Sequence, residues 1–257
     1  MGKRNNYALE PRPMGVGGQA EVFRARDKRT NQVVAFKRLL SNLSADRDAA
    51  ARMRREIEVQ SAIKHPNIMP VLDYSEHYHW YTMPLAEKSL LEMPTPIEYS
   101  QILQIIEDIA SGLAFAHQSG NIHRDITPNN ILELKSGDDS TRWVISDWGL
   151  VRRLGLTSFV RTSPGYPYGT DGFAAPESGQ DAHLVNASAD VYSLGRVVAW
   201  CASGNLPIQN FTLCPEGPLH DFILRTTKPY PHERVADMNE VLRMIEGLKN
   251  TSTEKEC

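Results

Sequence analysis

Short apolar or alternating runs fill the first third of the chain, and such runs predict β-strands. They cover residues 7–9, 21–25, 33–36, 68–72 and 80–83. After the third run, apolar residues recur at helical spacing up to about residue 64. Ser44 or Asp46 can cap that helix, and His65-Pro66-Asn67 ends it. We therefore expect a mainly β region that contains one long helix.

Helical periodicity dominates the rest of the chain. Apolar residues recur at helical spacing from Ile102 to Leu113, and Gly120 closes that segment. Further helices are predicted over 191–202, 219–225 and 235–248, and short strands over 131–134 and 143–145. Residues 150–175 have no periodicity and are rich in Gly, Pro, Ser and Thr. So long an irregular loop is usually functional or mobile.

Composition excludes several classes of protein. The chain has 257 residues, 41% hydrophobic and 23% charged, as in an ordinary globular protein. Its net charge of −3 gives no global electrostatic reason to expect nucleic acid as a partner. No apolar stretch approaches the roughly 20 residues of a membrane span, and the first residues lack the pattern of a signal peptide. Cys201, Cys214 and Cys257 form no disulfide framework, which favours a reducing, cytoplasmic location.

A glycine-rich segment, Gly15-Val16-Gly17-Gly18-Gln19-Ala20, lies between two predicted strands. Glycines let backbone N–H groups approach phosphate oxygens without a Cβ in the way. A helix would follow a dinucleotide-binding turn, whereas a strand follows here, which is the context of a loop that covers ATP phosphates. A glycine-rich hairpin without a ligand remains the alternative explanation.

The segment from His123 to Asn130 carries the strongest chemical signal. It places Asp125 and Asn130 five residues apart in one loop, and Asp147-Trp148-Gly149 follows a short apolar strand. Phosphoryl transfer from ATP needs such groups: one carboxylate for the acceptor hydroxyl, and an Asn and a second Asp for Mg²⁺. An Asx-type turn would explain an isolated Asp and Asn, but not the two motifs in this order.

Together these segments resemble the eukaryotic-type protein kinase family, in its Ser/Thr kinase-like form, from about residue 7 to residue 248. The glycine loop resembles those of bacterial members. The resemblance implies an α+β, bilobal protein kinase fold over residues 7–249. A small β-rich N-lobe of about 7–84 would contain a five-stranded sheet and one long helix, and a larger, mainly helical C-lobe would cover about 85–249. Residues 250–257 would form a polar C-terminal tail.

The resemblance also implies a role for each candidate site residue. Asp125 orients the acceptor hydroxyl, and Asn130 and Asp147 bind Mg²⁺. Lys37 is held on the α- and β-phosphates by Glu56, since the nearest alternative, Glu58, projects about 200° away on a helix. The residues expected around ATP are Gly15, Val16, Gly17, Gly18, Gln19 and Ala20 over the phosphates, and Val22, Ala35, Met83, Pro84, Ala86 and Leu132 around the adenine. The cofactors are then ATP and Mg²⁺, and the partner is a protein with a Ser or Thr acceptor.

Other residues are expected to support this site. By the same resemblance, Asp190 binds backbone N–H groups of the catalytic loop, and Arg234 pairs with Glu177 of Ala175-Pro176-Glu177. These segments, with Gly169-Thr170, favour a protein Ser/Thr acceptor over Tyr and argue against a small-molecule kinase.

Several departures from the family pattern are visible. Thr127 stands where a Ser/Thr kinase usually carries Lys, so one charge near the γ-phosphate is missing; Arg152 or Arg153 are candidates to replace it. Gln60 occupies a position that is normally apolar, and Trp148 replaces Phe. The stretch from Asp190 to Arg234 is short, and residues 205–218 are expected to form a loop where a helix often docks partners.

The expected activity is ATP- and Mg²⁺-dependent phosphorylation of Ser or Thr in proteins, including autophosphorylation in the activation loop. A pseudokinase or ATP-binding scaffold with weak or no transfer is the alternative that the departures leave open. A phosphate in the loop could order it through Arg124, unless the loop is simply unmodified. The candidate acceptors there, near Arg152, Arg153 and Arg161, are Thr157, Ser158, Thr162 and Ser163. The sequence does not determine the oligomeric state.

Overall fold

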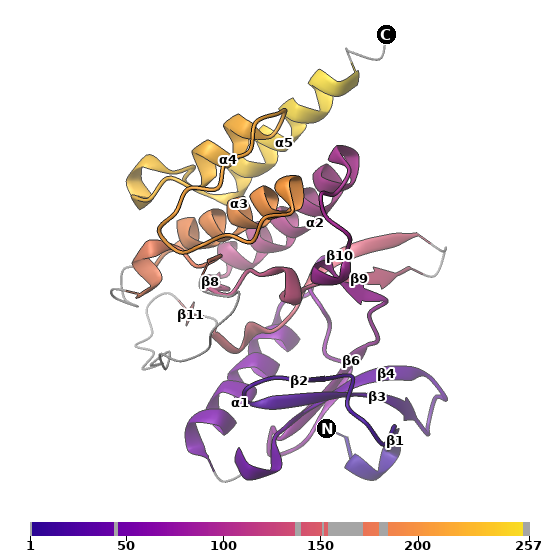
Figure 1. The fold of residues 1–257 in the computed structure, drawn as a ribbon. Coiled ribbons are helices and arrows are strands. Elements are labelled where there is room, and N and C mark those ends of the chain that lie inside the picture. Colours follow the sequence, from indigo (N-terminus) through magenta and orange to yellow (C-terminus); the bar gives the residue numbers. More distant parts are fainter. Residues whose placement is uncertain are drawn as a thin grey trace.

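The computed structural model describes residues 2–43, 46–136, 140–150, 152–153, 172–179 and 185–253. A β-sheet with one long helix forms one end of the molecule, and a group of helices forms the other (Figure 1). This arrangement confirms the predicted bilobal α+β architecture.

The N-lobe is built around an antiparallel sheet. Its strands run in the order β1-β3-β4-β6-β5, and β2 pairs with β3 beside that path. The bounds of these strands are Tyr7–Leu9 (β1), Gly15–Val16 (β2), Ala20–Asp27 (β3), Val33–Leu39 (β4), Asp73–Tyr74 (β5) and Trp80–Pro84 (β6). On one face Phe36 stacks on Trp80, with ring centroids 4.9 Å apart, beside Tyr7. The other face packs on the helix α1, so both faces of the sheet are covered.

Helix α1, Arg47–Ala62, crosses this second face and begins at a side-chain cap. Asp46 accepts hydrogen bonds from the backbone N–H groups of Asp48 and Ala49, which satisfies donors that a helix start leaves unpaired. The cap predicted at Asp46 is confirmed, whereas Ser44 lies outside the described residues. The buried residues of α1 include Met53, Ile57 and Glu56, so the apolar stripe also delivers one carboxylate to the interior.

The α-helices in the described part of the C-lobe are α2 (Tyr99–Gln118), α3 (Ala187–Ser203), α4 (His220–Thr226) and α5 (Met238–Thr253). Helix α3 is buried along almost its whole length and contacts α2, α4 and α5. It ends at Gly204, whose φ of +73° is the left-handed conformation that favours glycine. Among the described helices none is long and apolar enough to cross a lipid bilayer.

Short strands connect the lobes and frame the catalytic loop. One sheet has the order β10-β9-β7, and β8 pairs with β11. Their bounds are Lys88–Ser89 (β7), Asn121–Ile122 (β8), Ile131–Lys135 (β9), Thr141–Ile145 (β10) and Arg152–Arg153 (β11). The strands predicted over 131–134 and 143–145 are confirmed as β9 and β10 and leave the segments 123–130 and 146–149 beside each other.

The predicted strand over 68–72 is wrong. Ile68 forms only an isolated bridge with Ile145, and the N–H of Met69 donates to the carbonyl of Ile145 over 2.9 Å. The N–H of Leu72 instead donates to Thr82 of β6, over 2.8 Å. The segment thus changes partner from one sheet to the other, and no continuous ladder forms before β5.

The last helix also differs from its prediction. It begins at Met238 rather than near residue 235, because Arg234 stays extended and uses its side chain in a buried ion pair. It continues to Thr253, so residues 250–253, predicted as tail, are helical. Residues 205–218 contain no helix, as expected from the sequence.

Candidate active site

The segment 123–130, the candidate catalytic loop that follows β8, is fixed by one buried carboxylate of α3. Asp190 accepts hydrogen bonds from the backbone N–H groups of His123 and Arg124, each 2.8 Å long, and contacts Nε2 of His117 at 2.7 Å. Burial alone would raise the pKa of Asp190, but the contacts with His117 outweigh it and lower the pKa. Arg124 has a φ of +72°, which is strained for a residue with a side chain, so this anchoring also stabilises an unfavourable backbone conformation.

His123 joins the loop to the segment after β10. The N–H of Asp125 donates to Nδ1 of His123 over 3.2 Å, so Nε2 carries the proton and donates to the carbonyl of Ser146 over 3.0 Å. The ring is fully buried and meets the edge of Trp148, with centroids 4.6 Å apart. Burial lowers the pKa of His123, in agreement with this neutral tautomer. The residue therefore positions the loop.

Asp125 and Asn130 contact each other directly. Nδ2 of Asn130 donates to the carbonyl of Asp125 over 2.8 Å and to Oδ2 of Asp125 over 3.0 Å. Burial and the nearby carboxylate of Asp147 raise the pKa of Asp125 to about 7, against the opposing hydrogen bond from Asn130. A carboxylate with such a pKa can take up a proton near neutral pH, which suits a general base.

Lys37 binds two carboxylates from different parts of the fold. Its Nζ lies 2.6 Å from Oε1 of Glu56 on α1 and 3.1 Å from Oδ2 of Asp147 after β10. Tyr81, which faces Lys37 across β4 and β6, donates to the same oxygen of Glu56 over 2.6 Å. This arrangement confirms the pairing of Lys37 with Glu56, while Glu58 pairs with Arg54 on the surface.

Burial and mutual attraction compete in this cluster. Burial alone would lower the pKa of Lys37, but Asp147 and Glu56 raise it well above its ordinary value. Burial and the charge of Asp147 raise the pKa of Glu56 to about 7, although Lys37 and Tyr81 oppose the shift. Burial would also raise the pKa of Asp147, which Lys37 instead lowers. The ammonium is thus the main group that keeps Asp147 ionised, at the half-exposed edge of the cluster.

Gly149 gives Asp147 the space that it needs. A Cβ at position 149 would lie 3.3 Å from Oδ1 of Asp147 and 3.8 Å from Oε2 of Glu56. Asp147 itself has a φ of +64°, a strained value that its ion pair with Lys37 and its position after β10 maintain.

The residues predicted around the adenine come together in the structure. Ala35 and Met83 are buried in one apolar cluster, against which Val22, Ala86 and Leu132 pack. Pro84 follows Met83 at the end of β6 and pairs with Val34.

The glycine loop lies above β3 as a hairpin. Gly15 and Val16 pair with Val22 and Glu21, and the N–H of Gly17 donates to Ala20 over 2.8 Å; Gly18 and Gln19 form its tip. A Cβ at Gly15 would meet no atom within 4 Å, and one at Gly17 only the Ala20 carbonyl oxygen at 3.6 Å. Packing within the protein therefore does not require glycine at either position, whereas close approach of a ligand would.

Two side chains at this site are of the kind that binds Mg²⁺. Asp147 and Asn130 supply a carboxylate and an amide oxygen, the hard ligands that Mg²⁺ prefers. Among the residues that the structure describes, no three His, Cys, Asp or Glu side chains are grouped to hold a metal. A bound Mg²⁺ would therefore take its remaining ligands from phosphate oxygens and water.

The three side chains that depart from the expected pattern, Thr127, Gln60 and Trp148, are all buried. Thr127 is 4% exposed, and its carbonyl accepts the N–H of Asn130 over 3.0 Å. Gln60 and Trp148 are fully buried, and Trp148 fills the interior as predicted. Within the described part of the chain, the amide atoms of Gln60 and Nε1 of Trp148 have no hydrogen-bond partner. The interior beside the cluster thus contains polar groups that no described residue satisfies.

The segment 172–177 is anchored by a second buried ion pair. Glu177 receives two hydrogen bonds from Arg234, 2.9 and 3.2 Å long, and both side chains are buried. Phe173 and Ala175 are also buried, so the segment is fixed against the C-lobe. The predicted pairing of these two residues is confirmed.

Two functional contacts were not predicted. Tyr81 hydrogen-bonds to Glu56. Only a correct prediction of the pairing between β4 and β6, which places Tyr81 opposite Lys37, would have found this contact. His117, in the last turn of α2, contacts Asp190, which is 73 residues away and leaves no local signal.

Some predicted residues cannot be placed. Arg161, Gly169-Thr170 and the four candidate phosphorylation sites, Thr157, Ser158, Thr162 and Ser163, lie outside the described residues. For Arg152 and Arg153 the structure describes the backbone, in β11.

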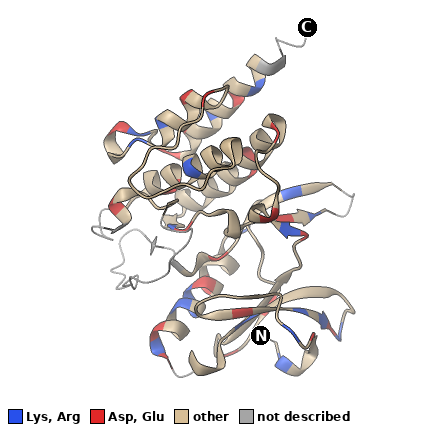
Figure 2. Ribbon diagram, in the orientation of Figure 1, with Lys and Arg blue, Asp and Glu red and all other residues tan. Residues whose placement is uncertain are grey.

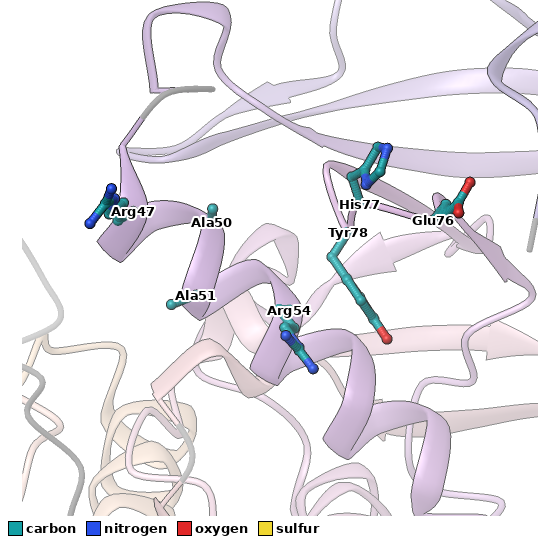
Figure 3. Close-up of a pocket in the computed structure, with 7 residues that line it drawn as sticks. All are labelled: Arg47, Ala50, Ala51, Arg54, Glu76, His77 and Tyr78. Atoms are coloured by element: carbon teal, nitrogen blue, oxygen red, sulfur yellow. The ribbon is translucent and has the colours of Figure 1, made fainter.

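A cavity of about 430 Å³ lies on the outer side of α1, away from this cluster (Figure 3). Its lining comprises Arg47, Ala50, Ala51, Arg54, Glu76, His77 and Tyr78. Glu56 projects about 180° away from Arg47 on the helix, so the cavity and the cluster occupy opposite faces.

Comparison with known proteins agrees with this geometry. The sequence matches the family described as "Protein kinase domain" over residues 9–245. It is 34% identical to the serine/threonine-protein kinase PknJ of Mycobacterium tuberculosis over 208 residues, 78% of this chain and 34% of that protein. It is 32% identical to PknB of Mycolicibacterium smegmatis and 31% to PrkC of Bacillus subtilis, both serine/threonine-protein kinases, over 76% of this chain and 32% and 30% of theirs. The chain spans about a third of the length of these curated relatives.

Replacing Gln60 with Leu should stabilise the protein. The substitution removes a buried amide that has no hydrogen-bond partner among the residues described, and we expect the free energy of unfolding to rise by about 1 kcal/mol. Denaturant unfolding measures this change. The matched control is Gln101→Leu on the exposed face of α2, which should change stability by less than about 0.5 kcal/mol. Destabilisation by Gln60→Leu alone would contradict the expectation.

Replacing Asp125 with Asn should stabilise the protein more at pH 8 than at pH 5. The pKa of Asp125 is raised to about 7 in the folded state, so folding binds a proton. The wild type therefore loses stability as the pH rises from about 4, the unfolded pKa, to about 7, and Asn avoids this loss. Melting temperatures at both pH values test this. The control is Asp221→Asn, at an exposed position of α4, whose change in melting temperature should be the same at pH 5 and pH 8. If Asp125→Asn also changes the melting temperature equally at the two pH values, the prediction is refuted.

Proposed function

The chain belongs to the protein kinase domain family, and on this premise we propose that it is an ATP- and Mg²⁺-dependent protein kinase. The acceptors are Ser and Thr hydroxyls of proteins, including hydroxyls of its own activation loop. The observation that best supports this is the ammonium of Lys37, bound to both Glu56 at 2.6 Å and Asp147 at 3.1 Å. Three groups from separate elements are already assembled around the place where phosphates would lie.

Each side chain has a distinct task in this proposal. Lys37, oriented by Glu56, binds the α- and β-phosphates, and the glycine loop covers them with backbone N–H groups. Asn130 and Asp147 would hold Mg²⁺, which would neutralise charge on the phosphates. Asp125 orients the acceptor hydroxyl and accepts its proton, because its raised pKa makes proton uptake favourable near neutral pH.

The segment 172–177 is proposed as the surface that receives the acceptor protein. Its burial against the C-lobe and the Arg234–Glu177 pair keep its backbone in one position. A fixed backbone lowers the entropic cost of orienting a flexible acceptor. We assign the kinase domain to residues 7–249, with lobes of about 7–84 and 85–249. We also propose that the protein is located in the cytoplasm.

A non-catalytic ATP-binding scaffold is less well supported. Such a protein would need to lack one of the groups that perform the chemistry, yet Lys37, Asp125 and Asp147 are all present and positioned. Thr127 and Gln60 change the surroundings of these groups and leave the groups themselves intact.

Substituting either Lys37 or Asp125 should abolish phosphoryl transfer. With Mg²⁺, radiolabelled ATP and casein, Lys37→Met and Asp125→Ala should each reduce the rate at least about 100-fold, since one loses phosphate binding and the other the base. Glu58→Gln, on the exposed part of α1, is the matched control and should retain full activity. Equal activity in all variants would refute the assignment. Nucleotide binding by the wild type without any transfer would instead favour the scaffold.

Introducing Lys at position 127 should raise the turnover number. The substitution adds the positive charge that this loop lacks beside the transferred phosphoryl group, and we expect an increase of about tenfold in kcat. Thr127→Met, of similar length but without charge, should not increase it. An unchanged kcat in Thr127→Lys would mean that another cationic side chain already stabilises the charge on the transferred phosphoryl group.

A further inference from the structure

Three large apolar side chains are exposed on the loop between α3 and α4. Leu206, Ile208 and Phe211 are 58%, 64% and 70% exposed. We call them the apolar loop patch. The loop carries no charged residue from Gly204 to Pro215, and it runs along the C-lobe without charge in Figure 2. Exposed apolar groups in one uncharged stretch are typical of surfaces that bind a partner.

One buried arginine orients this patch. Arg196 of α3 is 1% exposed, and its Nη2 and Nη1 donate to the carbonyls of Ile208 and Phe211, each over 2.8 Å. The N–H of Phe211 also donates to the carbonyl of Ile208 over 3.2 Å, across a turn in which Asn210 has a φ of +62°. Residues at the two ends of such a turn are neighbours. The two most exposed apolar side chains of the loop are therefore held next to each other.

The same arginine connects the patch to the proposed acceptor surface. Its Nε donates to the carbonyl of Gly172 over 2.9 Å. The backbone of Gly172 lies so close to Pro207 that an added Cβ would overlap the Pro207 carbonyl. Segment 172–177 is therefore fixed at one end by Arg196 and at the other by Arg234. The backbone of the loop that carries the patch is therefore joined directly to the backbone of segment 172–177.

A buried guanidinium is costly unless hydrogen-bond acceptors compensate its charge. Arg196 donates to three backbone carbonyls of irregular segments. These hydrogen bonds hold the loop in a conformation in which its apolar side chains stay exposed to water. Burying these side chains would be more favourable by roughly 1.5–3 kcal/mol each, so their exposure is best explained by a partner that covers them.

We propose that the apolar loop patch is a specificity-determining surface that binds large aliphatic or aromatic side chains of the acceptor protein, close to its Ser or Thr. This inference rests on the proposed kinase function. The contacts of Gly172 with Arg196 and Pro207 indicate the occupant, because an acceptor chain bound at segment 172–177 would lie next to this loop. The absence of charge on the loop disfavours acidic or basic partner segments.

The test uses two Ser/Thr peptide libraries, one with Leu and Phe around the acceptor and one with Gln and Asn there. The full chain should phosphorylate the apolar library with a kcat/KM about tenfold higher, mainly through KM. The triple variant Leu206→Ser, Ile208→Ser, Phe211→Ser should lose this preference and keep its kcat on the polar library. The control replaces three exposed apolar residues outside the patch, Leu91→Ser, Phe115→Ser and Leu224→Ser, and should keep the preference.

Other outcomes separate the possibilities. A wild type without preference, or a triple variant that retains it, overturns the proposal. Sedimentation experiments test whether the patch binds a second copy of the chain. If the wild type is a dimer, the triple variant alone is a monomer and the library preference is unchanged, a second copy is the occupant and the proposal is overturned. Binding of apolar peptides with Ala in place of the acceptor, measured by fluorescence anisotropy, needs no catalysis. If the wild type binds them more tightly than the triple variant but phosphorylates nothing, the surface stands and the kinase function falls.

Discussion

The ammonium group of Lys37 is the point at which the two lobes are joined electrostatically. It lies on β4 of the sheet, and its two carboxylate partners come from α1 and from the segment after β10. A buried charge left without partners costs several kcal/mol, so any movement of α1 or of Asp147 away from Lys37 is opposed. The ion pairs thus determine the relative position of the glycine loop, α1 and the catalytic loop. Tyr81 reinforces this by hydrogen-bonding to the same oxygen of Glu56.

The C-lobe uses buried charge in a related way, to fix chain that has no regular structure. Asp190 binds the backbone of the catalytic loop, and Arg196 binds carbonyls of the loop after α3. Arg234 binds Glu177 and also the carbonyl of Ser188 over 2.8 Å. Irregular segments cannot satisfy their backbone groups in a ladder, and charged side chains satisfy them instead. Two of these residues lie on α3, whose full burial makes it a rigid support.

The parts of the site that could be predicted from sequence are those whose residues lie close together in the chain or at a spacing that one helix defines. Asp125 and Asn130 share one loop. Glu56 was identified by its place in the family pattern, and helix geometry put Glu58 about 200° away from it. His117 and Tyr81 could not be predicted, because their partners are distant in sequence and only the folded arrangement brings them near. The strand expected over 68–72 failed for the same reason, since its apolar pattern could not show that the segment changes partner between two sheets.

The unsatisfied interior beside Lys37 changes how the site is held together. Helix α1 packs on the turn Trp148–Leu150 that follows Asp147, and Gln60 and Trp148 each carry a buried polar group without a partner in the described chain. Each such group costs about 1–3 kcal/mol relative to an apolar side chain of similar shape. Packing between α1 and this turn is therefore weaker than an all-apolar contact would be. The ion pair between Lys37 and Glu56 then contributes a larger share of the free energy that keeps α1 in place. Under the proposed function, the same pair positions the ammonium for phosphate.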